Sequence, residues 1–98
     1  MQASGKFKID TDICMAVVKG KPIFSCNGTI EIFEDGTVAV DSTDAFKPLL
    51  SGRDWKLMST TNISDTLWKI CLQRGDDRLD TMAEQIIPGS AFKFLIED

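Results

Sequence analysis

Clusters of acidic residues are the first place to look for chemistry in this sequence. Asp10-Thr11-Asp12 and Asp41-Ser42-Thr43-Asp44 each place two carboxylates close together, a composition that suits a divalent cation such as calcium. Each also has a simpler interpretation: the first as the polar connection between two strands, the second as the cap of a helix. We prefer the simpler interpretations and predict no metal site and no cofactor.

Two further short motifs lie between residues 74 and 77. Arg74-Gly75-Asp76 spells the integrin-binding tripeptide, and Gly75-Asp76-Asp77 is similar to the acidic pair of nucleic-acid polymerases. The tripeptide is short enough to arise by chance, and it stands in a turn before a predicted helix. A polymerase needs a much longer chain. We assign neither function to the protein.

The usual machinery of an enzyme is missing from the sequence. It has no histidine, the commonest general base, and no nucleophile motif of the G-x-S-x-G type. Its glycines stand singly at expected turns and form no phosphate-binding loop. Carboxylate pairs stay open as acid–base candidates because 15 acidic residues are present, but no spacing selects one pair. We therefore predict a non-enzymatic protein without catalytic residues.

The cysteines and asparagines bear on the compartment. Cys14, Cys26 and Cys71 are widely spaced among apolar residues, so we expect three reduced, buried thiols and no zinc site. The N-terminus has no signal-peptide pattern, which predicts a cytoplasmic protein. Both asparagines, Asn27 and Asn62, lie in N-x-[ST] sequons, and glycosylation there stays an open alternative.

Length and composition describe one small folded domain spanning residues 1–98. The chain is 43% hydrophobic and 27% charged, values typical of a globular protein. Its formal charge of −4 argues against a nucleic-acid-binding surface. No apolar run is long enough to cross a bilayer, so we predict no membrane partner.

Alternating hydrophobicity predicts strands over most of the chain. The clearest unit is the hairpin 28–41, whose two alternating arms flank Glu34-Asp35-Gly36, a loop suited to a type I turn with a glycine bulge. A second hairpin is expected over 13–26, around Lys19-Gly20-Lys21-Pro22. The other expected strands are 6–11, 91–96 and the paired strands 55–60 and 66–72, with a loop at 61–65.

A single helical turn and one longer helix complete the predicted elements. Pro48 limits the first to about one turn within 45–50, because proline cannot continue a helix interior. The second covers Asp77–Ile86, where apolar residues recur at helical spacing before Pro88 ends the pattern. That stripe is Leu79, Met82, Ala83, Ile86 and Ile87.

These elements predict an α+β fold that is mainly β. We expect a small antiparallel rolled sheet or partly open barrel of six or seven strands, with one helix at about 77–86. The apolar faces of the strands and of the helix form the predicted core. Its members are Phe7, Ile9, Cys14, Ala16, Val18, Ile23, Ile30, Ile32, Val38, Val40, Leu49, Trp55, Leu57, Trp68, Ile70, Leu72, Leu79, Met82, Ile86, Phe92 and Phe94.

The order of elements in the middle of the chain is similar to that of a known structural family. A hairpin, a short capped turn and then Gly52-Arg53-Asp54-Trp55 opening a strand resemble the tail-tube subunits of long-tailed bacteriophages. The resemblance implies a structural subunit and supports a role in assembly.

We expect a binding or assembly module that acts through a sheet edge or an exposed apolar patch on a protein partner or on a second copy of itself. A small ligand inside the rolled sheet is the alternative, although so small a barrel has little spare interior. The hairpin 28–41 is the candidate contact, because edge strands recruit partners by strand addition. If both of its arms are paired inside the sheet, this contact is lost. The candidate interface residues are Thr29, Glu31, Phe33, Thr37, Ala39 and Asp41.

Overall fold

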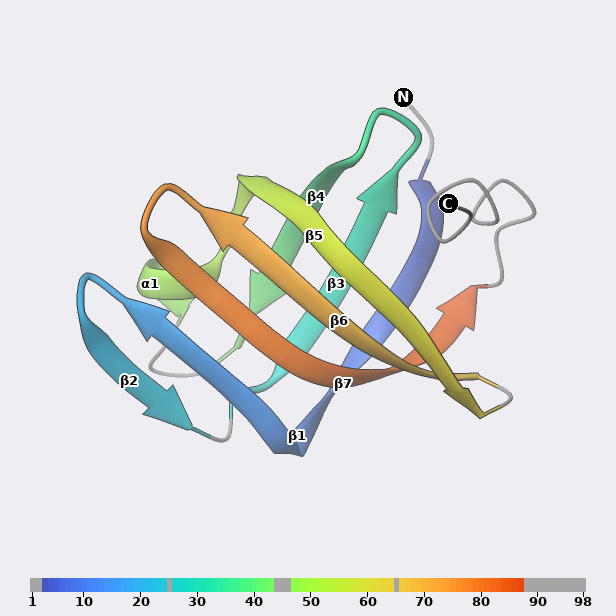
Figure 1. Cartoon of the computed structure of the whole chain (residues 1–98), viewed down its shortest axis with the longest axis horizontal. Coiled ribbons are helices and arrows are strands. Elements are labelled where there is room, and N and C mark those ends of the chain that lie inside the picture. The colour runs from blue at the N-terminus through green and yellow to red at the C-terminus, as the bar shows by residue number, and fades with distance from the viewer. Residues whose placement is uncertain (1–2, 25, 44–46, 65, 88–98) are drawn as a thin grey trace.

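The computed structural model describes residues 3–24, 26–43, 47–64 and 66–87. Across these ranges the chain forms seven strands and one four-residue helix (Figure 1). The elements are β1 (Ala3–Val18), β2 (Lys21–Phe24), β3 (Gly28–Phe33), β4 (Thr37–Ser42), α1 (Lys47–Leu50), β5 (Gly52–Ser64), β6 (Leu67–Arg74) and β7 (Asp77–Ile87). No helix in the described ranges is long and apolar enough to cross a membrane.

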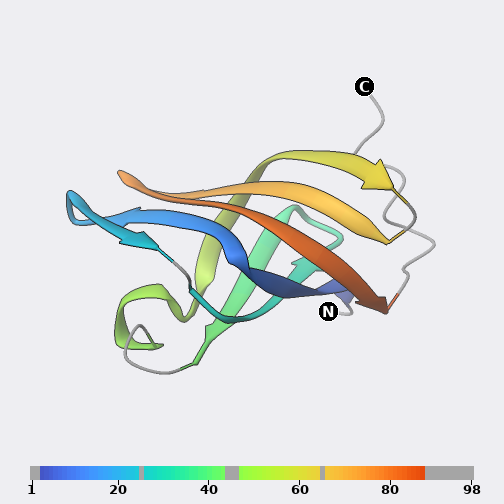
Figure 2. The same ribbon diagram turned by 90° about the horizontal axis from the view of Figure 1, so that it is seen from below.

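The strands form one antiparallel sheet that closes on itself. Hydrogen-bonded neighbours follow the order β1-β3-β4-β5-β6-β7, and β7 returns to pair with β1, so six strands make a barrel. β2 lies outside this ring, paired with the second half of β1. Figures 1 and 2 show the β1–β2 and β6–β7 hairpins extending to the same side of the barrel. The predicted small antiparallel barrel is confirmed, and it is closed.

β1 is one long bent strand, where the sequence predicted two strands joined at Asp10-Thr11-Asp12. Its first half pairs with β3 and its second half with β2, while β7 runs along both halves. The β1–β7 register shifts between Ile9 and Cys14, where residues 10–13 stand opposite Met82 alone. Such extra residues bend a strand and increase its local twist. The polar triplet is therefore a bend within a strand.

Residues 77–87 form the strand β7, so the predicted helix at 77–86 is wrong. β7 pairs with β1 on one side and with β6 on the other. Its buried row is Leu79, Thr81 and Ala83, whereas Met82 is half-buried and Ile86 is 50% exposed. A threonine in the inward row and apolar residues on the outward face hide the period of two, and a helical spacing results by coincidence. The Thr81 hydroxyl donates a hydrogen bond to the carbonyl of Met82 at 2.7 Å.

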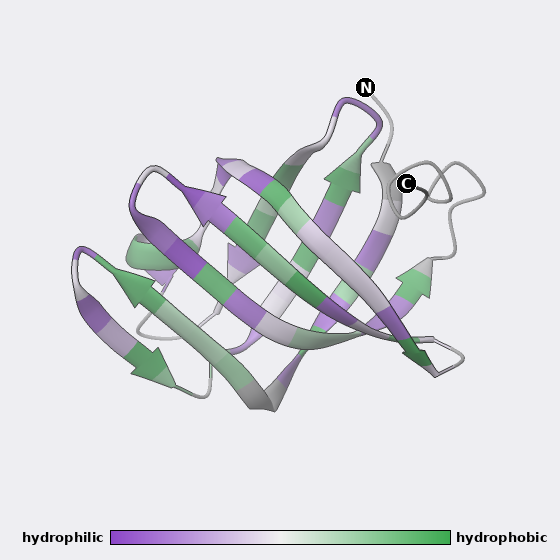
Figure 3. Ribbon diagram, viewed as in Figure 1, coloured by the Kyte–Doolittle hydropathy of each residue, from purple (hydrophilic) through white to green (hydrophobic). Residues whose placement is uncertain are grey.

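Large side chains fill the inside of the barrel, and hydropathy alternates along its strands (Figure 3). Phe7 and Trp68 meet edge to face, with ring centroids 6.3 Å apart. Most of the predicted core is buried, but Leu49 and Ile86 are 37% and 50% exposed. Leu57 and Met82 are only partly buried, and Phe92, Phe94 and the predicted strand 91–96 lie outside the described residues. Buried residues that the predicted core leaves out are Phe33, Leu50 and Ala83, and Cys26 is buried as its apolar neighbours predict.

Cys14 and Cys26 form a disulfide, so the expectation of three reduced thiols is wrong. The β1–β2 hairpin places Met15 opposite Phe24, and the two cysteines lie just beyond this pair. Their Cα atoms are 5.9 Å apart, within the usual range for a disulfide. Cys71 is half-buried and free. Apolar neighbours predicted burial, but they could not reveal which cysteines the hairpin would bring together.

Candidate functional site

The hairpin β3–β4, predicted to be the contact, has both arms paired inside the sheet. β3 lies between β1 and β4, and β4 lies between β3 and β5. The turn closes as predicted, with Gly36 at a φ of 87° and its N–H donating to the carbonyl of Phe33 at 3.0 Å. The hairpin therefore has no free edge for strand addition, and that part of the prediction is wrong.

The candidate interface residues on this hairpin divide between surface and core. Thr29 stands opposite Asp41, and Glu31 opposite Ala39, so these four share one face of the β3–β4 pair. Thr29, Glu31, Ala39 and Thr37 are half-buried, and Asp41 is exposed. Phe33 is 7% exposed and lies beneath the guanidinium of Arg53, 5.1 Å from the ring centroid. Whether the shared face contacts a partner stays a prediction.

The second half of β5 has a strand neighbour on one side only among the described residues. Its first half pairs with β4, and the last link on that side is a hydrogen bond from the N–H of Leu57 to the carbonyl of Gly36 at 3.3 Å. From Met58 to Ser64, β5 pairs with β6 alone among the described strands. Figures 1 and 2 show this part of β5 running out to the β5–β6 turn with β6 beside it.

This edge lacks two of the usual protections against strand addition, charged side chains and proline, but its strand is bulged. Natural edges are blunted by charged side chains, proline, short length or β-bulges. The β5–β6 register shifts between Leu57 and Ser59 and again between Asn62 and Ser64. The segment Met58-Ser59-Thr60-Thr61-Asn62-Ile63-Ser64 contains no charged residue, no proline and no glycine. Met58 and Ile63 are 57% and 49% exposed. The outer edge of β2, in contrast, is four residues long and carries Lys21 and Pro22.

Hydrogen bonds to neighbouring strands hold the end of β5 in place. The side-chain amide of Asn62 donates to the carbonyl of Leu67 at 3.2 Å, which fastens the end of β5 to the start of β6. The N–H of Gln85 donates to the carbonyl of Thr66 at 2.7 Å and so ties the β5–β6 turn to β7. An edge that is already ordered loses less conformational entropy when it binds another strand.

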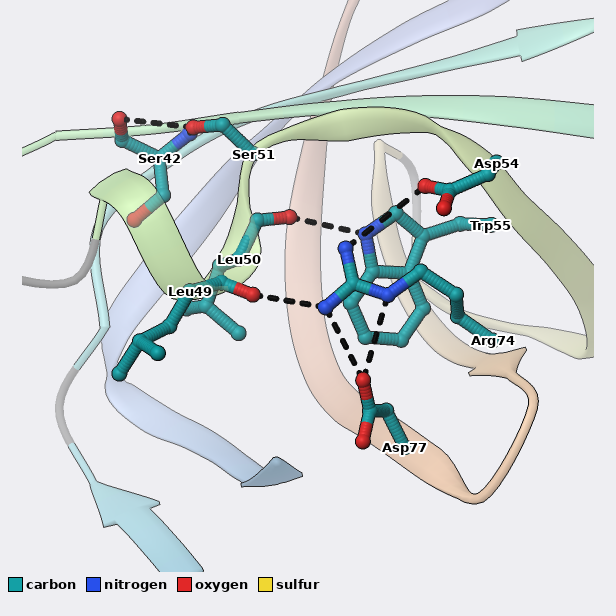
Figure 4. Close-up of polar contacts among 8 residues, drawn as sticks. All are labelled: Ser42, Leu49, Leu50, Ser51, Asp54, Trp55, Arg74 and Asp77. Carbon is teal, nitrogen blue, oxygen red and sulfur yellow. Dashed lines mark hydrogen bonds and ion pairs between the residues drawn. The ribbon is translucent and has the colours of Figure 1, made fainter. Parts of the chain in front are cut away.

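A charged cluster occupies the end of the barrel near α1 (Figure 4). The guanidinium of Arg74 lies over the buried ring of Trp55, 4.3 Å from the centroid. Its Nη2 donates to the carbonyl of Leu49 at 2.7 Å and to the carboxylate of Asp77 at 3.0 Å. Its Nη1 lies 3.7 Å from the carboxylate of Asp54. One side chain thereby joins α1, β5 and β7.

Two more contacts fasten α1 to the barrel (Figure 4). The indole N–H of Trp55 donates to the carbonyl of Leu50 at 2.8 Å. The backbone N–H of Ser42 donates to the hydroxyl of Ser51 at 2.9 Å, which links β4 to the residue after the helix. The side chains of Leu50 and Trp55 are fully buried, so α1 closes this end of the barrel.

Asp77 is a charged anchor of the same cluster. Its carboxylate accepts a hydrogen bond from the backbone N–H of Lys19 at 3.0 Å and pairs with Arg74. The Lys19 N–H and then Arg74 hold the pKa of Asp77 below its usual range, although partial burial opposes them. The contact ties the turn of the β1–β2 hairpin to the start of β7.

An open pocket of about 250 Å³ lies beside this cluster. The donors of Arg74 already serve Leu49, Asp77 and Asp54, so the arginine offers little to a ligand. The residues that line the pocket are Asp54, Lys56, Met58, Gln73, Arg74 and Gly75. This arrangement supports a structural role for Arg74, the first residue of the integrin-like tripeptide.

The strand β5 is longer than its sequence pattern predicts. The pattern predicts a strand that ends at Thr60 and a loop at 61–65, whereas β5 continues to Ser64. The available signal was the absence of glycine and proline from 53–74, which indicates long strands joined by a short turn.

Comparison with protein-family models, curated proteins and solved structures finds no match to this chain.

Proposed function

We propose that this protein is a non-enzymatic binding and assembly module that adds a partner strand to the outer edge of β5. The observation that carries this proposal is that Met58–Ser64 pairs with β6 alone among the described strands. Backbone N–H and C=O groups on such an edge bond to water until another strand replaces it. An extended polypeptide is the ligand that matches their spacing.

The chemistry of the edge favours a protein partner. Four consecutive hydroxyl and amide side chains lie between the exposed Met58 and Ile63, and no charge interrupts them. An uncharged strand with polar and apolar side chains fits this surface. The formal charge of −4 works against nucleic acid as the partner. A structural subunit of the tail-tube kind, as the Gly52–Trp55 resemblance implies, is one form that such assembly could take.

A small ligand inside the barrel has less support. Trp55, Phe7 and Ile30 are fully buried and occupy the interior that a ligand would need. The pocket beside Arg74 is open, and its main cation is engaged within the fold. Strand addition at β5 needs no such cavity.

The disulfide bears on where the module works. Disulfides persist in oxidising compartments and are rare in the cytoplasm. The buried Cys14–Cys26 bond therefore favours an oxidising compartment over the cytoplasm that the sequence predicts.

Selection of displayed extended peptides tests the proposed function. The target is the unmodified protein, and each selected peptide is then tested on a variant with Ser59→Lys and Thr61→Lys. Both residues are exposed, so the lysines charge the edge without entering the core. The matched control carries Ala39→Lys and Asp41→Lys on β4, at the same spacing.

We expect selected peptides to bind the protein and the β4 control alike and to lose at least about tenfold in affinity for the charged β5 edge, a difference of about 1.4 kcal/mol. Peptides that bind the β5 variant as well as the unmodified protein would contradict the proposal. Failure to select any peptide would contradict it as well.

A further inference from the structure

We propose that two copies of this chain pack together through the outer face of the strands β2, β1 and β7, related by a two-fold axis that crosses β7 at Leu79. The three strands are neighbours in the sheet (Figure 1). This inference goes beyond the proposed function, because it uses a different surface and does not depend on the β5 edge.

The outer face of these strands carries an exposed apolar pair. Ile23, Ala16 and Leu79 are buried on the inner face, so the residues that alternate with them point outward. Met15 stands opposite Phe24 on the outer face, and the two residues are 44% and 61% exposed. Apolar side chains that gather on one face and stay exposed indicate a contact surface.

Two rows of residues cross this face side by side. The β1–β2 register is regular, and the β1–β7 register is regular from Cys14 to Val17, so both rows are straight. The first row, from β2 to β7, is Pro22, Val17 and Arg78, and the second row is Phe24, Met15 and Asp80. Each row has two apolar residues and one charged residue, and the two charges have opposite signs. We call these two rows the β2–β1–β7 face.

The β2–β1–β7 face is complementary to itself. A two-fold axis that runs between the rows, parallel to the sheet and perpendicular to β7, places the first row of one copy over the second row of the other. Packed sheets lie about 10 Å apart, so the side chains of the two faces meet. Arg78 then meets Asp80 of the second copy, and the same pair forms a second time by symmetry. The apolar parts of the rows, on β2 and β1, meet one another in the same way.

The charges also select the direction of the axis. A two-fold axis along β7 would place Asp80 over Asp80 and Arg78 over Arg78, and like charges at such positions repel. Only the axis perpendicular to β7 joins opposite charges and apolar residues at the same time. The occupant that fits this face is therefore a second copy with its β7 running antiparallel.

The ion pair within one copy leaves both groups able to make this contact. The Nη2 of Arg78 lies 3.7 Å from Oδ1 of Asp80, which is too far for a hydrogen bond. Within the part of the chain that the structure describes, this buried oxygen has no hydrogen-bond donor. The side chain of Arg78 is 59% exposed and long enough to reach another copy. The carboxylate of Asp80 thus gains a donor when two faces meet.

Sedimentation equilibrium of charge variants tests the contact. The patch is small, so we expect the unmodified protein to form a weak dimer. Arg78→Glu and Asp80→Arg should each dimerise about tenfold more weakly, because each turns both ion pairs into like-charge contacts. An equimolar mixture of the two variants should dimerise about as tightly as the unmodified protein, because both contacts of the mixed dimer again join opposite charges. Lys6→Glu is the matched control: it makes the same charge change at the other end of β1 and should dimerise like the unmodified protein.

An apolar variant tests the same face without a change of charge. Phe24→Ser should dimerise at least about fivefold more weakly, because the contact loses apolar area. Ile86→Ser is the matched control, since Ile86 is 50% exposed on β7 but lies outside the two rows, and it should leave the dimer unchanged. Thermal melts show whether each variant is folded, and this pair of variants tests the face even if Asp80→Arg does not fold.

Three results would overturn the inference. The first is an unmodified protein that stays monomeric up to about 1 mM. The second is a mixture of Arg78→Glu and Asp80→Arg that is no tighter than its components. The third is an equal effect of Phe24→Ser and Ile86→Ser.

The outcomes also separate this inference from the proposed function. Peptides selected for the β5 edge should bind Arg78→Glu as well as they bind the unmodified protein. Dimerisation through the β2–β1–β7 face without any peptide for the β5 edge would support this inference and contradict the proposed function. Peptides that bind the β5 edge of a strictly monomeric protein would do the reverse.

Discussion

Loss of Arg74 should destabilise the fold clearly, because its guanidinium joins α1, β5 and β7. Replacement by alanine removes a cation–π contact with the buried ring of Trp55, which contributes about 1 kcal/mol. It also removes a charge-assisted hydrogen bond to Leu49, worth about 1.5 kcal/mol. The pair with Asp77, whose side chain is 17% exposed, adds up to about 1 kcal/mol. The 3.7 Å pair with Asp54, which is 69% exposed, adds almost nothing.

Arg74→Ala should therefore lower the free energy of unfolding by about 3 kcal/mol and the melting temperature by about 10–25 °C for a domain of this size. Urea titration and thermal melting followed by circular dichroism measure both quantities. Arg74→Lys keeps the charge but loses the flat guanidinium face over Trp55. Its stability should therefore lie between that of the unmodified protein and that of Arg74→Ala.

Arg78→Ala is the matched control for this prediction. Arg78 is 59% exposed and lies 3.7 Å from Asp80, so its loss should change stability by less than about 0.5 kcal/mol. The reasoning is refuted if Arg74→Ala melts within a degree or two of the unmodified protein, or if Arg78→Ala is equally destabilising.

Three more predictions concern the disulfide, acid stability and β7. Replacing Cys14 and Cys26 together by alanine should lower stability by about 3 kcal/mol in urea titration, because the bond closes a loop with a sequence separation of 12; a change no larger than that of Cys71→Ala would contradict this. The pKa of Asp77 is lowered in the folded state, so its contribution is present above the ordinary value of 3.8 and is lost as pH falls through the folded pKa. In urea titrations, Asp77→Asn should thus make the free energy of unfolding depend less on pH in the acid range. An unchanged dependence would refute the lowered pKa of Asp77. In thermal melts, Thr81→Asp should destabilise the protein strongly and Ile86→Asp should be tolerated. The reverse order would support a helix at 77–86 in place of the strand β7.

Local patterns predicted the local parts of this fold. The β3–β4 hairpin follows from two alternating arms around Asp35 and Gly36, since a single turn fixes its register. The single turn of α1 follows from Pro48. Each of these signals lies within a few residues of the structure it specifies.

The remaining features depend on pairings between distant residues. The helical spacing in β7 was misleading because its inward row includes Thr81 and Ala83, and only the neighbours β1 and β6 decide which face is covered. The Cys14–Cys26 bond requires the β1–β2 register to be known. Both are tertiary facts that no short window of sequence contains.

The candidate contact in the structure differs from the predicted one for the same reason. An edge strand is defined by the absence of a neighbour on one side, and the sequence of a hairpin does not contain this information. The arms of the hairpin 28–41 are not edges because β1 pairs with one and β5 with the other. The edge at Met58–Ser64 has no second neighbour among the described strands because β5 extends beyond β4. Its uncharged composition was visible in the sequence, but its exposure was not.

Amide hydrogen exchange, measured residue by residue by NMR with and without a selected peptide, tests the central claim that the β5 edge is the contact. Edge amides that lack a partner exchange faster than those within a ladder. We predict that amides of Met58–Ser64 pointing away from β6 become slower when the peptide binds, while those of the β3–β4 hairpin, already paired on both sides, do not change. Protection that grows in the β3–β4 hairpin, with none gained along Met58–Ser64, would contradict the account.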